Sequence, residues 1–318
     1  MNAQSLGISR RRFIVSASFT AAALSLTPRQ LFGAEQNLVA GARASGAKSK
    51  IATQALRGNV SALIGSGGNI AVLPGSDGKL IVDSGYLSSR EKIAAALDGI
   101  SRDPVKHLVN THWHFDHTDG NEWMHSAGAT IMAHENTKKR LSTTTRVDDW
   151  DFTFPPSPAA AIPTEITGAE KTLHLSGATV ALKYYDPAHT DGDISIYFTE
   201  ADVIHTGDTW WNGYYPFIDY STGGSINGMI KAAEANLTMV TDKTIVISRH
   251  GPVGGKTEMT EYRDMLATIR DRVVALKGEG KSLDEIVAAK PTAAYDAKWG
   301  KGFVNGEFFT KLVYKGVG

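Results

Sequence analysis

The sequence predicts a layered α/β protein, with sheets inside and helices outside. Short apolar runs of strand length are separated by Gly, Asn, Ser and Asp, which are typical of turns. Longer segments, whose apolar residues have helical spacing, alternate with these runs. A set of strands followed by helix–strand alternation occurs once in the first half of the chain and again in the second. Propensity alone leaves several architectures of this class open.

The first half is expected to open with three strands of a β-meander. They lie within residues 60–65, 68–75 and 78–85. A helix is predicted over 88–100, with Ser88 and Glu91 forming a capping box. The next expected elements are a buried strand at 105–110, a helix at 121–129, a strand at 130–134 and a helix at 136–144.

The second half begins with residues 148–168, which hold four prolines. We predict a long irregular loop there, and such loops often act as lids over functional sites. Four further strands are expected at 171–175, 178–186, 193–199 and 202–208. They are followed by a helix at 224–240, a strand at 243–250, a long helix at 257–277 and a short helix at 282–290.

Composition limits the classes of partner. The 318-residue chain has a formal net charge of zero and a pI near 7.2, so nothing in it favours a nucleic-acid partner. Without cysteine it forms no disulfides. We interpret residues 35–58, which are polar and rich in Ala, Gly and Ser, as a linker or arm, and residues 59–318 as a single domain.

The N-terminal segment is read as an export signal. "SRRRFIV" (residues 9–15) precedes a short Ala-rich apolar run that is too weakly apolar for a membrane span. The pattern resembles a bacterial twin-arginine signal covering residues 1–34, with cleavage at Ala34 or as late as Ala42. This implies the twin-arginine export machinery as a partner, a periplasmic location, and no stable membrane insertion after signal removal.

Ligand-type side chains are concentrated in "THWHFDHTDGN" (residues 111–121), between a predicted strand and a predicted helix. His112 and His114 alternate, so in an extended segment they would point the same way, toward one metal ion. Asp116 and His117 follow at once, and a turn there could direct them to a second ion. Asp119 is interpreted as a turn residue before the next helix.

Three more predicted loops carry residues of the same kind. His189 precedes a strand, Asp208 directly follows one, and His250 ends another. Neutral imidazoles and carboxylates are the ligands that zinc prefers alongside thiolates, and this chain has no cysteine. Ligand-bearing loops at strand ends are typical of sites in open α/β sheets.

These motifs resemble those of the metallo-β-lactamase superfamily. Its His-x-His-x-Asp-His motif corresponds to His112, His114, Asp116 and His117, and its later ligands correspond to His189, Asp208 and His250. The resemblance covers roughly residues 58–275. It implies a four-layer αββα sandwich of two mixed β-sheets flanked by helices, with the site at one edge. Asp83 matches the early aspartate that braces the site.

The resemblance also implies the chemistry. His112, His114 and His189 would bind one Zn²⁺, and Asp116, His117 and His250 the second, with Asp208 bridging them. A hydroxide held between the ions would attack the substrate, and Asp116 could act as general acid or base. The family's usual glycines are replaced by Ala188 and Arg249. We expect Arg249 to point outward into solvent; the alternative is positive charge near the site, which favours an anionic substrate.

The remaining candidates stay open or are expected to be structural. We expect structural roles for five histidines, of which His205 could also support the site: His107, His125, His134, His174 and His205. The aromatic residues after Asp208 could form a substrate wall or pack in the core: Trp210, Trp211, Tyr214, Tyr215 and Phe217.

The predicted activity is hydrolysis of an ester-like or amide-like bond in a small molecule. A lactone, ester, thioester or β-lactam would fit, and the sequence does not separate them. No basic cluster for glutathione follows His250. Two alternatives remain: an iron-dependent oxidoreductase similar to the persulfide dioxygenases of the superfamily, and a non-catalytic metal-binding protein. Iron or manganese could replace zinc.

Overall fold

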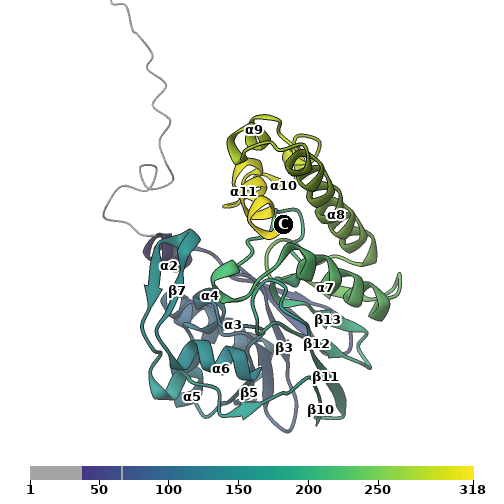
Figure 1. The fold of residues 1–318 in the computed structure, drawn as a ribbon. Coiled ribbons are helices and arrows are strands. Elements are labelled where there is room, and N and C mark those ends of the chain that lie inside the picture. Colours follow the sequence, from purple (N-terminus) through teal and green to yellow (C-terminus); the bar gives the residue numbers. More distant parts are fainter. Residues whose placement is uncertain (1–37, 66) are drawn as a thin grey trace, which may run out of the picture. The chain divides into compact units, whose positions relative to one another are not determined.

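The computed structural model describes residues 38–65 and 67–318, and Figure 1 shows how their elements are arranged. The predicted signal at residues 1–34 lies outside the described residues. Two mixed β-sheets lie face to face between two groups of helices. This confirms the predicted fold class.

The first sheet has seven strands, of which four form an antiparallel meander and three continue in parallel. In spatial order they are β1 (Ala52–Ala55), β2 (Ser61–Ile64), β3 (Ile70–Leu73), β4 (Lys79–Val82), β5 (Val105–Val109), β6 (Thr130–Ala133) and β9 (Glu165–Ile166). Each strand expected from the sequence is present close to its predicted bounds.

The second sheet has five strands, antiparallel except for its last pair. They are β10 (Glu170–Leu175), β11 (Ala178–Tyr184), β12 (Ile194–Phe198), β13 (Val203–His205) and β14 (Ile245–Ile247). A separate hairpin is formed by β7 (Thr145–Val147) and β8 (Phe152–Phe154).

The helices form two groups, and in Figure 1 α9, α10 and α11 lie next to α8, beyond the sheets. In the first half of the chain they are α2 (Leu38–Lys48), α3 (Arg90–Ile100), α4 (Phe115–Thr118), α5 (Asn121–Ser126) and α6 (Glu135–Ser142). In the second half they are α7 (Ile226–Met239), α8 (Lys256–Gly278), α9 (Leu283–Ala288), α10 (Asp296–Trp299) and α11 (Gly306–Gly316). Among the described residues, no helix has the length and apolarity to cross a membrane.

Successive side chains along the strands pack into two different hydrophobic layers. On β3, Ala71 and Leu73 belong to the core between the sheets, whereas Ile70 and Val72 belong to the core beneath α3 and α5. Because successive side chains of a strand point to opposite faces, an all-apolar strand covers both layers at once. The apolar runs in the sequence are therefore strands buried on both faces.

Residues 35–58 differ from the expected linker or arm. Helix α2 and edge strand β1 occupy most of the described part of this range, and β1 pairs with β2. Only Val39 and Gly46 of α2 are buried, so its sequence lacks a clear apolar stripe. The helix is held by side chains from the region of α3 instead, which a local sequence pattern does not reveal.

Two smaller expectations also change. The hydroxyl of Ser88 donates to the carbonyl of Arg43 (2.8 Å), and α3 begins at Arg90 without a side-chain cap, so the predicted capping box is wrong. Residues 148–168 are not wholly irregular, because they contain β8, β9 and two short 3₁₀ turns.

Candidate metal centre

The seven ligand-type residues lie where four strands end. Residues 111–120, called the metal loop below, follow β5 and include the single turn α4, so the predicted turn at Asp116 and His117 is helical. His189 follows β11, Asp208 follows β13 in a 3₁₀ turn, and His250 follows β14. The carboxyl ends of these strands therefore bring residues from four distant segments together.

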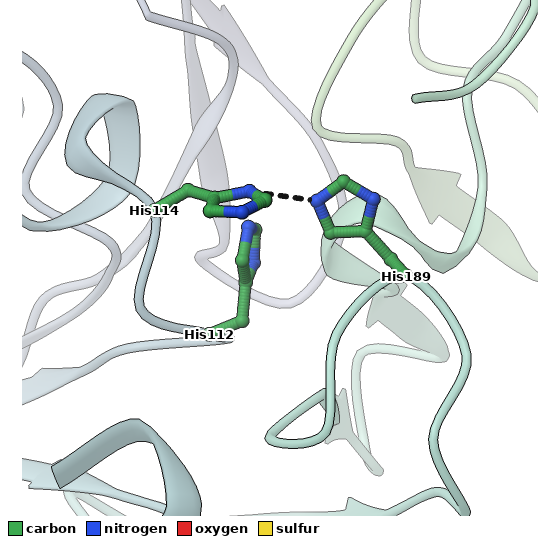
Figure 2. Close-up of side chains that lie close together, drawn as sticks. All are labelled: His112, His114 and His189. Carbon is green, nitrogen blue, oxygen red and sulfur yellow. Dashed lines mark hydrogen bonds between the residues drawn. The ribbon is translucent and has the colours of Figure 1, made fainter. Parts of the chain in front are cut away.

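Three groups of side chains have ligand atoms within 4.8 Å of one another. They are His112, His114 and His189; Asp116, His117 and His250; and His112, His117 and Asp208. Figure 2 shows the first group, with the three imidazole rings converging from the metal loop and from the loop after β11. The structure thus brings all seven predicted residues to one place.

Asp208 lies between the first two groups. One of its oxygens, Oδ2, is 3.4 Å from His189 Nε2 and 3.4 Å from His250 Nε2, while Oδ1 is 3.3 Å from His117 Nε2. Asp116 Oδ2 is 3.4 Å from both His117 Nε2 and His250 Nε2. A single carboxylate in contact with both groups could bind an ion in each of them.

Outer hydrogen bonds fix which ring nitrogens can act as ligands. His189 Nδ1 lies 2.7 Å from the carbonyl oxygen of Phe217, which only accepts, so Nδ1 carries the proton. His114 Nε2 lies 3.0 Å from the Asp219 carboxylate and donates to it in the same way. The remaining nitrogens, His114 Nδ1 and His189 Nε2, then face each other at 2.9 Å as two lone pairs (Figure 2). A cation bound to both satisfies this arrangement.

In the other two histidines of the metal loop, Nδ1 also contacts an outer partner, which leaves Nε2 as the possible ligand atom. His117 Nδ1 is 2.8 Å from Asp83 Oδ2, and His112 Nδ1 is 3.2 Å from the Thr111 hydroxyl. Their Nε2 atoms and Asp208 Oδ1 are buried, and none has a hydrogen-bond partner among the described residues. Buried polar atoms are rarely left unpaired. The donor set therefore fits divalent metal ions.

Asp83 contacts the metal loop through Thr111 and His117. It is fully buried and accepts hydrogen bonds from the Thr111 amide (2.8 Å), the Thr111 hydroxyl (2.9 Å) and His117. Burial alone would raise the pKa of this carboxyl, but His117 and then Arg249 keep it below its usual value. Asp83 is therefore an anion that orients His117.

Electrostatics suit coordination. Burial lowers the pKa of His189 to about 4 and that of His112 well below its usual value, so both are neutral. Burial opposes ionisation of Asp208 and Asp116, yet the histidines around them, His250 and His117, hold both carboxyl pKa values well below the usual range. Neutral imidazoles and ionised carboxylates are the forms that bind metal. Burial also disfavours the charged forms of His117 and His250, but the carboxylates around them raise both pKa values above the usual one, so a bound ion would displace a proton from each.

Arg249 contradicts its predicted outward position. It is fully buried, donates from Nη1 to the Asn69 carbonyl (2.7 Å) and from Nη2 to the Asp116 carbonyl, and its Nε lies 3.9 Å from Asp83. Solvation would favour the outward rotamer, but two buried carbonyls and a carboxylate supply stronger, charge-assisted partners. Because it is inaccessible to solvent, Arg249 does not contact a substrate.

Two supporting residues were missed in the sequence. Asn69 donates from Nδ2 to the carbonyls of Ser248 (2.7 Å) and Gly251 (2.8 Å), which flank His250. Asp219 accepts from His114 and from the Thr222 hydroxyl (2.6 Å). Neither residue lies in a ligand motif, and nothing in the local sequence indicates its partner.

The aromatic residues after Asp208 mostly pack in the core. Trp210, Tyr215 and Phe217 are almost completely buried, so the substrate-wall interpretation of Trp210 is wrong. Trp211 is different, because its ring centroid is 4.2 Å from that of His250. Tyr214 is partly buried and lies against the backbone near Gly302.

A second aromatic group covers the metal loop from the hairpin β7–β8. Trp150 lies 4.8 Å from the His114 ring and 4.9 Å from the Phe217 ring, and Phe154 lies 5.3 Å from the Trp113 ring (centroid distances). Trp150 and Phe154, both within the predicted loop at residues 148–168, therefore lie next to the metal loop.

The five histidines expected to be structural belong to none of the ligand groups found in the described ranges. His205 is buried and its ring contacts the Asn69 carbonyl and the Gly207 amide (both 3.1 Å). Asp119 does end the turn α4, but its carboxylate also pairs with Arg43, which the turn interpretation did not include.

Comparison with known families and proteins gives a consistent assignment. The family described as "Metallo-beta-lactamase superfamily" matches residues 63–268. A hydroxyacylglutathione hydrolase of Rhodospirillum rubrum is 27% identical over 209 residues, covering 64% of this chain and 69% of that protein. A protein of the same name from Pelagibacter ubique is 27% identical over 106 residues, or 33% of this chain and 36% of that one.

Solved structures show the same fold at low identity. A metallo-β-lactamase from Pontibacter korlensis superposes with a TM-score of 0.56 at 14% identity, covering 69% of this chain and 99% of that one. An inverting sec-alkylsulfatase from Pseudomonas sp. gives a TM-score of 0.62 at 16% identity, covering 83% of this chain. The match spans only half of the alkylsulfatase chain.

Proposed function

The chain belongs to the metallo-β-lactamase superfamily, and from this premise we propose that it is an exported hydrolase that uses two zinc ions. The observation that carries the proposal is the pair of ligand groups joined by Asp208, with lone pairs directed inward by outer hydrogen bonds. The names of the two curated relatives support hydrolysis of an ester-like bond.

In this proposal each ion has its own ligand group. His112, His114 and His189 would hold one ion, Asp116, His117 and His250 would hold the other, and Asp208 is within reach of both groups. When bound, the ions supply Lewis acidity and lower the pKa of a coordinated water toward neutrality. The protein supplies the outer partners, Asp83, Asp219 and the Phe217 carbonyl, which would aim the donor nitrogens at the ions.

Substrate would enter from the side of Asp116 and His250. Their side chains are 11% and 25% exposed, whereas His112, His114 and His117 are inaccessible or nearly so. Asp116 is therefore the carboxylate that can both hold a metal ion and receive or give a proton at the reacting bond.

The surroundings favour an uncharged substrate with an apolar group. Trp150 and Trp211 flank the ligand rings, and Trp150 stands beside Asp148, Asp149 and Asp151. The nearby cations are engaged, because Arg146 pairs with two of these aspartates and Lys315 with the third. A lactone, ester, uncharged thioester or amide suits this environment better than an anionic glutathione conjugate.

A substrate panel with zinc-loaded protein tests the proposal. Esters, lactones, thioesters and β-lactams would be assayed with wild type, Asp116→Ala, His112→Ala and the control His125→Ala, whose ring bonds only the Ala129 carbonyl among the described residues. We expect turnover of at least one class, its loss in the first two variants, and its retention in the control. Near-full activity of either ligand variant would refute the site.

Metal analysis of protein from native cells separates the alternatives. Two equivalents of zinc support the proposal, whereas stoichiometric iron without zinc supports the oxidoreductase. A metal-replete protein that hydrolyses nothing in the panel supports the non-catalytic alternative. Zinc content therefore supports the proposal only together with turnover of at least one substrate class in the panel.

Export is proposed on the basis of the motif at residues 9–15. Replacing both Arg10 and Arg11 by Lys keeps the charge but removes the paired arginines that the route requires. We expect the full-length variant to remain in the cytoplasmic fraction while wild type reaches the periplasm. Equal periplasmic yields would rule out the twin-arginine route.

A further inference from the structure

We propose that helix α2 positions the metal loop, through the pairing of Arg43 with Asp119. This inference rests on the proposed two-ion site. In it, Arg43 and Asp119 are positioning residues: neither touches an ion or a substrate, and both act through Asp116 and His117. Residues 38–48 would then be part of the functional unit, although the sequence predicts a linker or arm there.

The contact between the two residues is bidentate. Arg43 Nε lies 2.6 Å from Asp119 Oδ2, and Arg43 Nη2 lies 2.7 Å from Asp119 Oδ1. The Asp119 side chain is only 13% exposed, whereas that of Arg43 is 43% exposed. Two parallel, charge-assisted hydrogen bonds fix orientation as well as distance, which a single contact does not.

Asp119 transmits this constraint to the ligands because it ends their helical turn. It is the C-terminal cap of α4, and its amide donates to the Phe115 carbonyl (2.9 Å). Asp116 and His117 lie within this turn. A carboxylate at the C-terminal end of a helix is unfavourable unless a cation compensates it. Arg43 supplies that cation, so the pair stabilises the turn in the position that aims both ligands.

A second contact reinforces the first. The Arg43 guanidinium carbon lies 5.4 Å from the centroid of the Phe115 ring, within cation–π range. Val39, also on α2, is buried in a small cluster with Phe115 and Tyr86. Helix α2 therefore contacts both Phe115, which precedes Asp116, and Asp119, which ends the turn.

Helix α2 is itself anchored independently of the metal loop. Its C-terminal carbonyls accept hydrogen bonds from side chains in and next to α3: Ser88 to Arg43 (2.8 Å), Ser89 to Gly46 (3.1 Å), and Lys92 to Ala47 (2.6 Å). The bond from Lys92 reaches the Ala47 carbonyl, one of the last four that a helix end leaves without an intrahelical partner. The helix is thus a fixed support rather than a segment carried by the loop.

The chain offers a matched control for a merely stabilising ion pair. Arg57 also joins the N-terminal part of the domain to a distant residue, with Nη1 3.1 Å from Asp202 Oδ2. Its side chain is 46% exposed, close to the value for Arg43. Asp202 follows β12 and contacts Thr244, neither of which is a ligand residue.

The test measures metal affinity directly. Wild type, Arg43→Ala, Asp119→Asn, Arg43→Lys and Arg57→Ala would be freed of metal by chelation and titrated with zinc in a calorimeter. We expect Arg43→Ala and Asp119→Asn to lower the affinity for the second equivalent of zinc by about 10-fold, as changes to the outer partners of metal ligands typically do. The affinity for the first equivalent should fall by less than about twofold. Arg43→Lys should fall between them and wild type, and Arg57→Ala should bind like wild type.

Unfolding of the metal-free variants completes the test. Similar, small losses of stability in Arg43→Ala and Arg57→Ala, with a binding defect only in the first, support positioning. Unchanged binding in Arg43→Ala, or an equal defect in Arg57→Ala, overturns it. Wild type that takes up no second equivalent would overturn the two-ion function itself, a result distinct from a failure of the Arg43 variant alone.

Discussion

Arg249 donates a hydrogen bond from Nη2 to the backbone carbonyl of Asp116, a residue 133 positions earlier in the chain. The residue next to one ligand, His250, thereby fixes the backbone of another. Its second bond, to the Asn69 carbonyl, ties both to the turn between β2 and β3. A buried guanidinium in this place is a structural cross-link between the loops of the second ligand group.

Replacing Arg249 should cost stability without any change in exposed charge. In Arg249→Met the Asp116 carbonyl loses its side-chain donor, while the Asn69 carbonyl keeps only His205 among the described residues. An unsatisfied buried acceptor costs about 1–3 kcal/mol. Arg249→Lys keeps the charge but not the forked geometry, so we expect a smaller loss. Urea unfolding of the metal-free proteins measures this, with Arg102→Met, whose side chain is 88% exposed, as control. A wild-type midpoint in Arg249→Met would show that the cross-link is dispensable.

Asp219→Asn should weaken the first ligand group. An amide offers one acceptor oxygen, whereas the Asp219 carboxylate accepts from His114, the Thr222 hydroxyl and the Ser221 amide. Loss of the bond to His114 Nε2 frees the imidazole to rotate, and we expect about 10-fold weaker binding of the first zinc equivalent. Calorimetric titration is the measurement. Asp202→Asn, away from the ligands, should bind like wild type; equal affinities for all three proteins would contradict the role of Asp219.

Trp150→Ala should alter substrate affinity more than metal content. Deleting all of residues 148–168 is a blunter test, because it removes β9 and the Ala161 carbonyl that accepts from Asn121. The single change removes only the ring beside His114 and Phe217. We expect a raised KM with two equivalents of zinc still bound, and no such effect from Trp123→Ala on α5. Loss of metal in Trp150→Ala would assign this ring a structural role instead.

His205 predicts a pH dependence of stability. Burial lowers its pKa to about 4 in the folded protein, against about 6.5 when unfolded. Between these values the unfolded state binds more protons, so stability falls as pH drops from 6.5 toward 4 and is unaffected by His205 well above 6.5. Between pH 7 and pH 5, metal-free His205→Gln should lose about 2 kcal/mol less than wild type. Parallel pH profiles from denaturant unfolding would rule this out.

The sequence predicts which ligand-type residues come together, because each of them lies next to a strand with a clear apolar run. His112, His189, Asp208 and His250 had to lie at sheet edges once those runs were read as strands, and the edges coincide in the fold. Both faces of these strands are buried, so their continuous apolar runs can be recognised in the sequence without knowing which elements pack against them.

The supporting residues could not be predicted in the same way. Arg249, Asp219 and Arg43 act through partners that lie between 76 and 180 positions away, and no local spacing encodes such a pair. Arg249 is the clearest case. An arginine side chain is usually exposed, and this one is buried because the Asn69 and Asp116 carbonyls accept its hydrogen bonds.

The bonds from Asn69 to both sides of His250 span 179 and 182 residues, which has a consequence for the order of folding. Contacts between such distant segments form late, because the chain must first close a long loop. A partly folded chain therefore presents only the neighbouring ligands of the metal loop, and the last ligand arrives when both sheets are in place. Uptake of a second ion would then mark the moment at which the domain is complete.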